Sequence, residues 1–545
     1  MDITRRDLLE TTVYAAAGAA LLSVPGSRAQ AQDAAFDIDA AFATFMRDLG
    51  QDAGDAGGAV TFTGEDPILR SHFRIGAAMA LPAMAAAVSA AAIWKERTGE
   101  GQDVAIDLRE AVYNVNPLMT PIMQVRLATG AVAPDDPVAT GFTFSPTVNG
   151  ILPQGPVGLG NPFSFVPFRT RDGRFMNITA VYPHLMNRAL TLLDCAPERE
   201  AIAAAVATWD GETLEAAMFD AGVVGVMHRT TAEWLAHPEG IHLAGTDLIE
   251  IRKVSDSAPV AWAPDPTQPL SGIKALSLTH VIAGSVAART LSEYGAEVLH
   301  IMRDQSFEHE GLWADVNVGM RSANLDLNRA DQNAALAALI PQADVFIDGF
   351  SGRGIERLGF GVERVASERP GIVYLTMRGY SWDGPWKMVR TFDMEALATT
   401  GFTVAEGSGG FPSYGESFPE PEGDGPPPAF PPTLVMNDYI AGYLGAAGII
   451  AALRRRATEG GSYHVHVNLA RAAMWYASLG TFSSTDFEPG EANRMIEPRT
   501  IRFASPYGEV HRLAPMAQLS RTPGQWQQPL LTVRGSDLPA WKHQL

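Results

Sequence analysis

The sequence predicts an α/β protein with a doubly wound parallel sheet and a smaller α+β domain. Beyond residue 268, apolar runs typical of buried strands alternate with helical segments, which is the pattern of a parallel sheet covered by helices on both faces. An Ala-rich helix, a glycine turn and an alternating strand also occur twice, at 91–108 and 451–469. With 46% hydrophobic and 19% charged residues, the chain has the composition of an ordinary globular protein.

The regular alternation extends over residues 268–480. Its apolar runs predict strands at 273–283, 297–302, 343–347 and 371–377. Its helices are expected at 285–294, 332–339, 362–368 and 439–456. The last of these helices belongs to the second copy of the repeated unit, so the chain contains either a duplication or a rearrangement.

The remaining parts of the chain are less regular. Residues 32–265 are mixed, with helical stretches near 184–193 and 198–221. Closely spaced prolines at 264–269 oppose a helix or a central strand, so a linker is predicted there. Residues 481–545 show little periodicity, and we expect this tail to wrap over the surface.

Residues 1–31 have the layout of a twin-arginine export signal. Arg5 and Arg6 precede an uncharged stretch, and an Ala-Gln-Ala sequence at 29–31 follows as a candidate cleavage site. The alternative is an ordinary N-terminal helix that carries two arginines. The apolar stretch at 75–94 is dominated by alanine, and we expect a packing helix there, not a membrane span.

The net charge of −20 argues against nucleic acid or an anionic membrane as partner, because both require a basic face. Cys195 is the only cysteine, so an intramolecular disulfide and a cysteine-based metal site are excluded. His464 and His466 alternate on a predicted strand with no carboxylate evident nearby, so no metal site is expected. The turn at 281–287 lacks G-x-G-x-x-G, which opposes dinucleotide binding.

A series of motifs resembles family III CoA-transferases, the CaiB/BaiF family that includes formyl-CoA transferases and alpha-methylacyl-CoA racemases. The series comprises 269–279 with 283–284, 293–299, 317–322, 325–327, 343–345, 349–350, 356–359, Tyr374, 379–380, and Asp438 with Gly442. The resemblance covers 268–470 and implies a Rossmann-like CoA-binding region. Residues 70–265 resemble the second half of the family, so the order is reversed, as in a permuted chain or a fusion of two truncated copies.

The resemblance implies that Asp438 is a nucleophile that attacks the acyl-CoA carbonyl, forming a mixed anhydride and then an aspartyl-CoA thioester. Asp438 stands at the predicted start of a helix, where the positive end of the dipole favours an ionised carboxylate. From the residues alone, an Asp before an apolar helix is more often a simple N-cap. In the first copy the aligned position lies near Ala78 with no carboxylate close by, so we expect one catalytic copy.

The resemblance also implies contacts with coenzyme A, whose phosphates require local cations in so acidic a protein. The expected CoA-binding residues are Val281, Ala283, Arg303, Phe350, Arg357, Arg378 and Tyr380. For each arginine the alternative is a solvated surface charge. Three arginines at or beyond the C-terminal ends of parallel strands favour the ligand interpretation, because ligands bind there.

The predicted activity is transfer of CoA between an acyl-CoA thioester and a carboxylic acid, without a permanently bound cofactor. In the family's racemases a proton-transferring His directly precedes an Asp, whereas Phe392 precedes Asp393 here, which disfavours a racemase and leaves Asp393 a structural role. A non-catalytic CoA-binding protein is the third alternative. The family implies a homodimer. CoA chemistry favours the cytoplasm and a used export signal the periplasm, so the localisation stays open.

Overall fold

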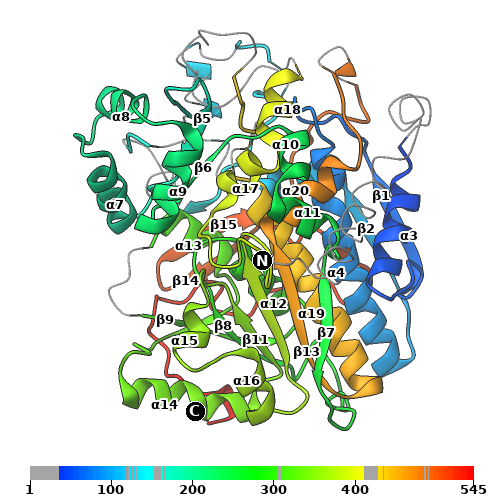
Figure 1. The fold of residues 1–545 in the computed structure, drawn as a ribbon. Helices are drawn as coiled ribbons and strands as arrows, with labels where there is room; N and C mark the ends of the chain where they lie inside the picture. The colour runs from blue at the N-terminus through cyan, green and yellow to red at the C-terminus, as the bar shows by residue number, and fades with distance from the viewer. Residues whose placement is uncertain are drawn as a thin grey trace, which may run out of the picture.

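The computed structural model describes residues 36–544, apart from 118–119, 121–122, 125–126, 129, 131–132, 137, 152–160, 164–166, 304–307, 410–426, 432, 434, 484–485 and 489. The predicted export signal at 1–31 lies outside the described residues. Figure 1 shows a central sheet with helices on both sides, a smaller helical region at the upper left, and two long helices side by side at the right.

The central sheet has seven strands. In spatial order they are β10 Arg321–Asn324, β9 Glu297–Met302, β8 Lys274–Leu278, β11 Val345–Asp348, β12 Val373–Arg378, β13 Ser462–Asn468 and β7 Glu250–Ser255. All neighbours pair in parallel except β13 and β7. The chain runs outward from β8 in one direction and then from β11 in the other, which is the topology of a doubly wound sheet. The predicted fold class is confirmed, and β10 and β7 are strands that the sequence pattern did not indicate.

Side chains of the sheet alternate between two cores. Val345 and Ile347 of β11 pack in the core that contains α12 (Ala283–Glu293) and α19 (Asn437–Glu459). Phe346, between them, packs in the core that contains α14 (Ala330–Leu339) and α16 (Val362–Glu368). Helices therefore cover both faces, which explains why all four residues of β11 are buried.

The two copies of the repeated unit meet in the middle of the molecule. Helix α4 (Ile75–Thr98) packs against α19, and each ends at a glycine that leads into a strand (Figure 1). The strands join different sheets, because β2 (Gln102–Asp107) lies between β1 (Gly57–Thr63) and β16 (Gln518–Leu519) while β13 joins the central sheet. Helix α4 is long and apolar enough to cross a membrane, but it is buried inside the protein, as expected of a packing helix.

The smaller region combines a three-stranded antiparallel sheet with helices. Its strands are β4 Phe168–Arg169, β5 Phe175–Ile178 and β6 Gly225–Met227, and its helices are α7 Pro183–Leu193, α8 Arg199–Val206 and α9 Gly211–Ala221. The expected helical stretch at 198–221 is two helices, because the carboxylate of Asp172 accepts hydrogen bonds from the Gly211 amide at 3.2 Å and starts a new helix there. The linker predicted at 264–269 contains neither helix nor strand.

The tail is more ordered than the sequence indicated. Strands β14 (Thr500–Ser505) and β15 (Gly508–Leu513) form a hairpin, which pairs with β3 (Thr147–Val148). Trp541 is fully buried in the core beside α14 and donates a hydrogen bond to the Leu339 carbonyl at 3.2 Å. The expectation of a tail that only wraps over the surface is therefore wrong, since its widely spaced apolar residues insert into a core formed by distant segments.

Shorter helices connect these parts. They are α3 Ile38–Asp48, α5 Leu108–Ala111, α10 Thr231–Ala236, α11 Pro238–Ala244, α13 Glu310–Val316, α15 Gly354–Arg357, α17 Asp393–Thr399, α18 Phe402–Ser408 and α20 Leu469–Ala477.

Candidate functional site

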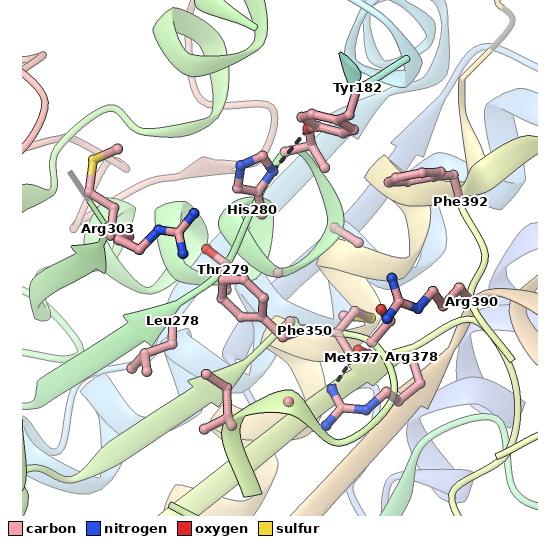
Figure 2. A pocket seen from close by; sticks show the side chains of 18 of the residues that line it. Tyr182, Leu278, Thr279, His280, Arg303, Phe350, Met377, Arg378, Arg390 and Phe392 are labelled. Atoms are coloured by element: carbon pink, nitrogen blue, oxygen red, sulfur yellow. Dashed lines mark hydrogen bonds between the residues drawn. The ribbon is translucent and has the colours of Figure 1, made fainter. Parts of the chain in front are cut away.

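A cavity of about 820 Å³ opens at the carboxyl ends of β8, β9, β11 and β12. Ligands of doubly wound proteins bind at this edge, where the strand order reverses. The start of α19 contributes Asp438 to the wall, and the smaller region contributes Tyr182, His184, Leu185 and Val224. The cavity therefore lies between two parts of the chain that are far apart in the sequence (Figure 2).

Asp438 lies in the first turn of α19 and is 7% exposed. Burial raises the pKa of Asp438 to about 7, and the nearby Glu395 adds to this rise. Desolvation of this buried carboxylate therefore opposes the ionised form that the helix dipole was expected to favour. Near neutral pH the group is poised between its acid form and its nucleophilic form.

Asp393 holds the start of this helix. Its Oδ2 accepts a hydrogen bond from the Asp438 amide at 2.8 Å, and its Oδ1 has no hydrogen-bond partner in the part of the chain that the structure describes. Burial, and then the charge of Asp438, raise the pKa of Asp393 well above its ordinary value. Two adjacent buried carboxyls resist ionising together, so Asp393 also influences the acidity of Asp438.

The first copy of the repeat carries a similar cap without the nucleophile. Asp66 accepts hydrogen bonds from the amides of Gly76 at 3.0 Å and Ala77 at 2.8 Å, at the start of α4. The expectation that no carboxylate lies near Ala78 is therefore wrong. Asp66 lies in the loop that precedes α4, outside the repeated unit of helix, turn and strand. The first turn of α4 itself contains no carboxylate.

The turn between β8 and α12 forms one wall of the cavity and contains both Val281 and Ala283. Val281 has a φ of 51°, a left-handed conformation that is strained for a β-branched residue. Gly442 of α19 lies against this turn, since a Cβ there would stand 2.9 Å from the Ala283 carbonyl oxygen and closer still to Val286. The small residue lets α12 approach α19 one turn beyond Asp438.

Among the expected CoA-binding side chains, Arg303, Phe350 and Arg357 line the cavity. Phe350 is 38% exposed, which is unusual for a large apolar side chain. Arg378 also lines the cavity, but its guanidinium is buried and paired with Asp348 at 2.6 Å. The Arg378 side chain is therefore held at the end of β11 by this ion pair and has little freedom to bind a phosphate.

Tyr380 does not line the cavity. Its ring packs against Trp234 and Trp386, and its hydroxyl hydrogen-bonds to Thr399 at 2.8 Å. The interpretation of Tyr380 as a residue beside the thioester is not supported by this position. Trp234 of α10 and Trp386 cover Tyr380, and the motif alone could not indicate that cover.

Sequence reasoning missed a polar cluster that joins the turn after β8 to the smaller region. His280 shares a 2.9 Å hydrogen bond with the Tyr182 hydroxyl through Nδ1, and its Nε2 lies 3.6 Å from a Glu308 carboxylate oxygen (Figure 2). Burial, then the charges of Glu308 and Asp438, raise the pKa of the Tyr182 hydroxyl. Tyr182 belongs to the smaller region, so no local pattern could place it beside His280.

Arg390 is a second residue that the sequence analysis missed. It lines the cavity two residues before Phe392, which also lines it. Burial lowers the pKa of Arg390, and the nearby Arg188 and Arg357 lower it further. A group of guanidiniums that destabilise one another is a suitable place for an anion. The only signal in the sequence was one basic residue in a loop, which is too common to single out.

Residues 270–514 match the family model of CoA-transferase family III. The acetyl-coenzyme A transferase nodX of Hypoxylon pulicicidum is 31% identical over 47% of this chain and 43% of its own length. The succinyl-CoA–L-malate CoA-transferase alpha subunit of Chloroflexus aurantiacus is 30% identical over 38% of this chain and 48% of its own. The chain thus spans less than half the length of these two relatives.

Among solved structures, a CaiB/BaiF family protein from Brucella suis is 21% identical, with 44% of this chain and 65% of that chain covered and a TM-score of 0.32. Because this structural match is partial, the fold class of this chain rests on the order of its own strands. Residues 270–514 are therefore similar to CoA-transferase family III, the family that the motifs of this region resemble.

Proposed function

We propose that this chain transfers CoA between an acyl-CoA thioester and a carboxylic acid, with Asp438 as the covalent nucleophile. The observation that carries the proposal is the position of Asp438: a carboxylate in the first turn of α19 that faces a large cavity at the carboxyl edge of a parallel sheet. The family match over 270–514 supports the same class of reaction.

The proposed reaction begins when a carboxylate oxygen of Asp438 attacks the thioester carbonyl carbon. The carbon–sulfur bond breaks, CoA leaves as a thiolate, and an acyl-aspartyl anhydride forms. The thiolate then attacks the aspartyl carbonyl, which releases the first carboxylic acid and leaves CoA on Asp438 as a thioester. An acceptor carboxylate reverses these two steps, receives the CoA and frees Asp438.

The surroundings of Asp438 suit these steps. The carboxyl must be ionised to attack, and its raised pKa makes the aspartate a more basic nucleophile once ionised. Asp393 fixes the backbone at Asp438 through the 2.8 Å bond to its amide. Arg303, Arg357 and Arg390 supply positive charge for the phosphates of CoA, and Val281 and Ala283 border the path to Asp438.

A racemase is the second candidate within the family. Phe392 lines the cavity in front of Asp393 and cannot accept a proton. His280 is an imidazole that lines the same cavity, however, so alpha-proton exchange should be measured directly.

The test measures formation of a new acyl-CoA from an acyl-CoA donor and a carboxylic acid by mass spectrometry. Asp438→Asn is expected to lower the rate on the order of 10⁴-fold, as loss of a covalent nucleophile does. Asp383→Asn, at a side chain 51% exposed on the surface, is the matched control and should leave transfer unchanged. Undiminished transfer by Asp438→Asn would remove the nucleophile from the proposal. Deuterium uptake at the alpha carbon without transfer would favour the racemase.

A further inference from the structure

The cavity has two chemically different ends. Charged side chains gather beyond the carboxyl ends of β9, β10 and β11, and they include Arg303, Asp326 and Arg357. The residues that the structure places around Asp438 are mainly apolar. This difference bears on which group of the substrate reaches the nucleophile.

Three apolar lining residues lie close to the first half of α19. Phe392 directly precedes Asp393, whose carboxylate binds the Asp438 amide. Leu469 accepts a hydrogen bond from the Asn437 side chain at 3.0 Å through its carbonyl. Met377 reaches α19 two turns beyond Asp438, since its Cε would stand 3.0 Å from a Cβ at position 445.

The smaller region closes this end with further apolar surface. Leu185 and Val224 line the cavity and are 3% and 2% exposed. Together with Tyr182 they form an apolar cluster against which Val281 and Phe392 pack. The ring of Phe392 stacks on that of Tyr182, with 6.0 Å between their centroids. The wall around Asp438 therefore combines aliphatic and aromatic side chains from both parts of the chain.

The arginines that line the cavity have partners other than a carboxylate of the acyl group. The guanidinium of Arg378 is paired with Asp348, which leaves no charge for a substrate carboxylate at that position. Arg390 stands closest in sequence to the apolar wall, and with the nearby Arg188 and Arg357 it forms a group of guanidiniums that suits a multiply charged phosphate better than a single carboxylate. We assign Arg390 to the highly charged phosphate part of CoA.

We infer that the acyl group transferred at Asp438 is uncharged and apolar, an alkyl or aryl carboxylic acid without a second carboxylate. The inference rests on the proposed function and adds the substrate class to it. Apolar surface of the acyl group would be removed from water against Leu185, Val224 and Phe392, which favours longer chains. A second carboxylate at the same place would be buried without a partner, which is costly.

The experiment compares kcat/KM for acetyl-, butyryl-, hexanoyl-, phenylacetyl- and succinyl-CoA with one acceptor acid. Each methylene that enters the apolar end should raise kcat/KM up to about fourfold. Butyryl-CoA should exceed succinyl-CoA, which carries a carboxylate in place of the terminal methyl, by on the order of 100-fold. Equal or faster use of succinyl-CoA, or no dependence on chain length, would overturn the inference.

Two variants tie the preference to the wall. Val224→Phe narrows the apolar end, so hexanoyl-CoA should lose its advantage over acetyl-CoA while acetyl transfer continues. Val254→Phe, on β7 at a side chain 38% exposed, is the matched control and should keep the wild-type ratio. Leu185→Ala provides a second readout if Val224→Phe does not fold, and it should lower the hexanoyl-to-acetyl ratio. An unchanged ratio in the folded variants would contradict the inference.

Covalent labelling separates this inference from the proposed function. Acylation of Asp438 by any of the five thioesters supports the nucleophile, whatever the order of their rates. The order of the rates tests the apolar acyl group. Labelling of Asp438 with succinyl-CoA as the best donor would keep the nucleophile and reject the apolar acyl group.

Discussion

The acidity of one carboxyl group governs the proposed chemistry at the scale of the residue. Burial raises the pKa of Asp438 to about 7, from an ordinary value of 3.8. Because the ionised form attacks, the acylation rate should rise with pH and level off above about 7. An unperturbed aspartate would give a flat profile above pH 5. Stopped-flow measurement of CoA release between pH 5 and 9 checks this, and a midpoint below pH 5 would contradict it.

Substitution of Asp393 tests whether its carboxyl group contributes to the raised pKa of Asp438. Asp393→Asn retains an oxygen that can accept from the Asp438 amide, but it removes a group that competes for the same charge. We expect the midpoint of the rate profile to move to lower pH, with the helix start intact. If Asp393 serves only as a cap, the midpoint should stay where it is in the wild type.

Single hydrogen bonds join separate elements of the fold. Tyr182→Phe removes the bond to His280 that connects the smaller region to the turn after β8, while the ring can still stack on Phe392. The free energy of unfolding should fall by about 1 kcal/mol, and kcat/KM should fall as well. Tyr380→Phe is the control: it loses a bond to Thr399 outside the cavity, so stability should fall similarly with kcat/KM unchanged. Chemical denaturation and steady-state kinetics measure the two effects.

Helix α18 is fastened to the N-terminal half by Glu406, which accepts from the Ser71 hydroxyl at 3.0 Å and the His72 amide at 2.9 Å. Burial raises the pKa of Glu406 from 4.5 to about 8. A raised pKa in the folded state means that stability is present in full below pH 4.5 and is lost as the pH rises through 8.

Glu406→Gln should therefore reduce the decline of the unfolding free energy between pH 5 and 8. Glu363→Gln, at an exposed position of α16, should show the wild-type decline. Urea denaturation at several pH values makes the comparison, and an identical slope in Glu406→Gln and wild type would contradict the assigned acidity.

The whole molecule places one cavity between two parts of a single chain. The parallel sheet and several boundaries, including β9 and α16, could be predicted from local patterns, because apolar periodicity is a property of neighbouring residues. Asp438, Val281 and Arg303 could be placed at the site because they follow the sheet's own motifs.

Contacts between distant segments could not be predicted in the same way. Tyr182 meets His280 only after the smaller region folds over the sheet, and Tyr380 is covered by Trp234 from a distant helix, α10. Asp66 caps α4 from a loop that carries no strand or helix pattern, and Trp541 enters the core from a tail with little periodicity. Burial was equally invisible in the sequence, so the dipole was expected to outweigh desolvation at Asp438.

The most direct test of the central claim is to locate the covalent adduct. The protein is mixed with an acyl-CoA, quenched with hydroxylamine and digested, and the peptides are examined by mass spectrometry. A hydroxamate on Asp438, absent from Asp438→Asn and present in Asp383→Asn, is the predicted result. A protein that transfers CoA with no modification of Asp438, or with the adduct on another residue, would contradict it.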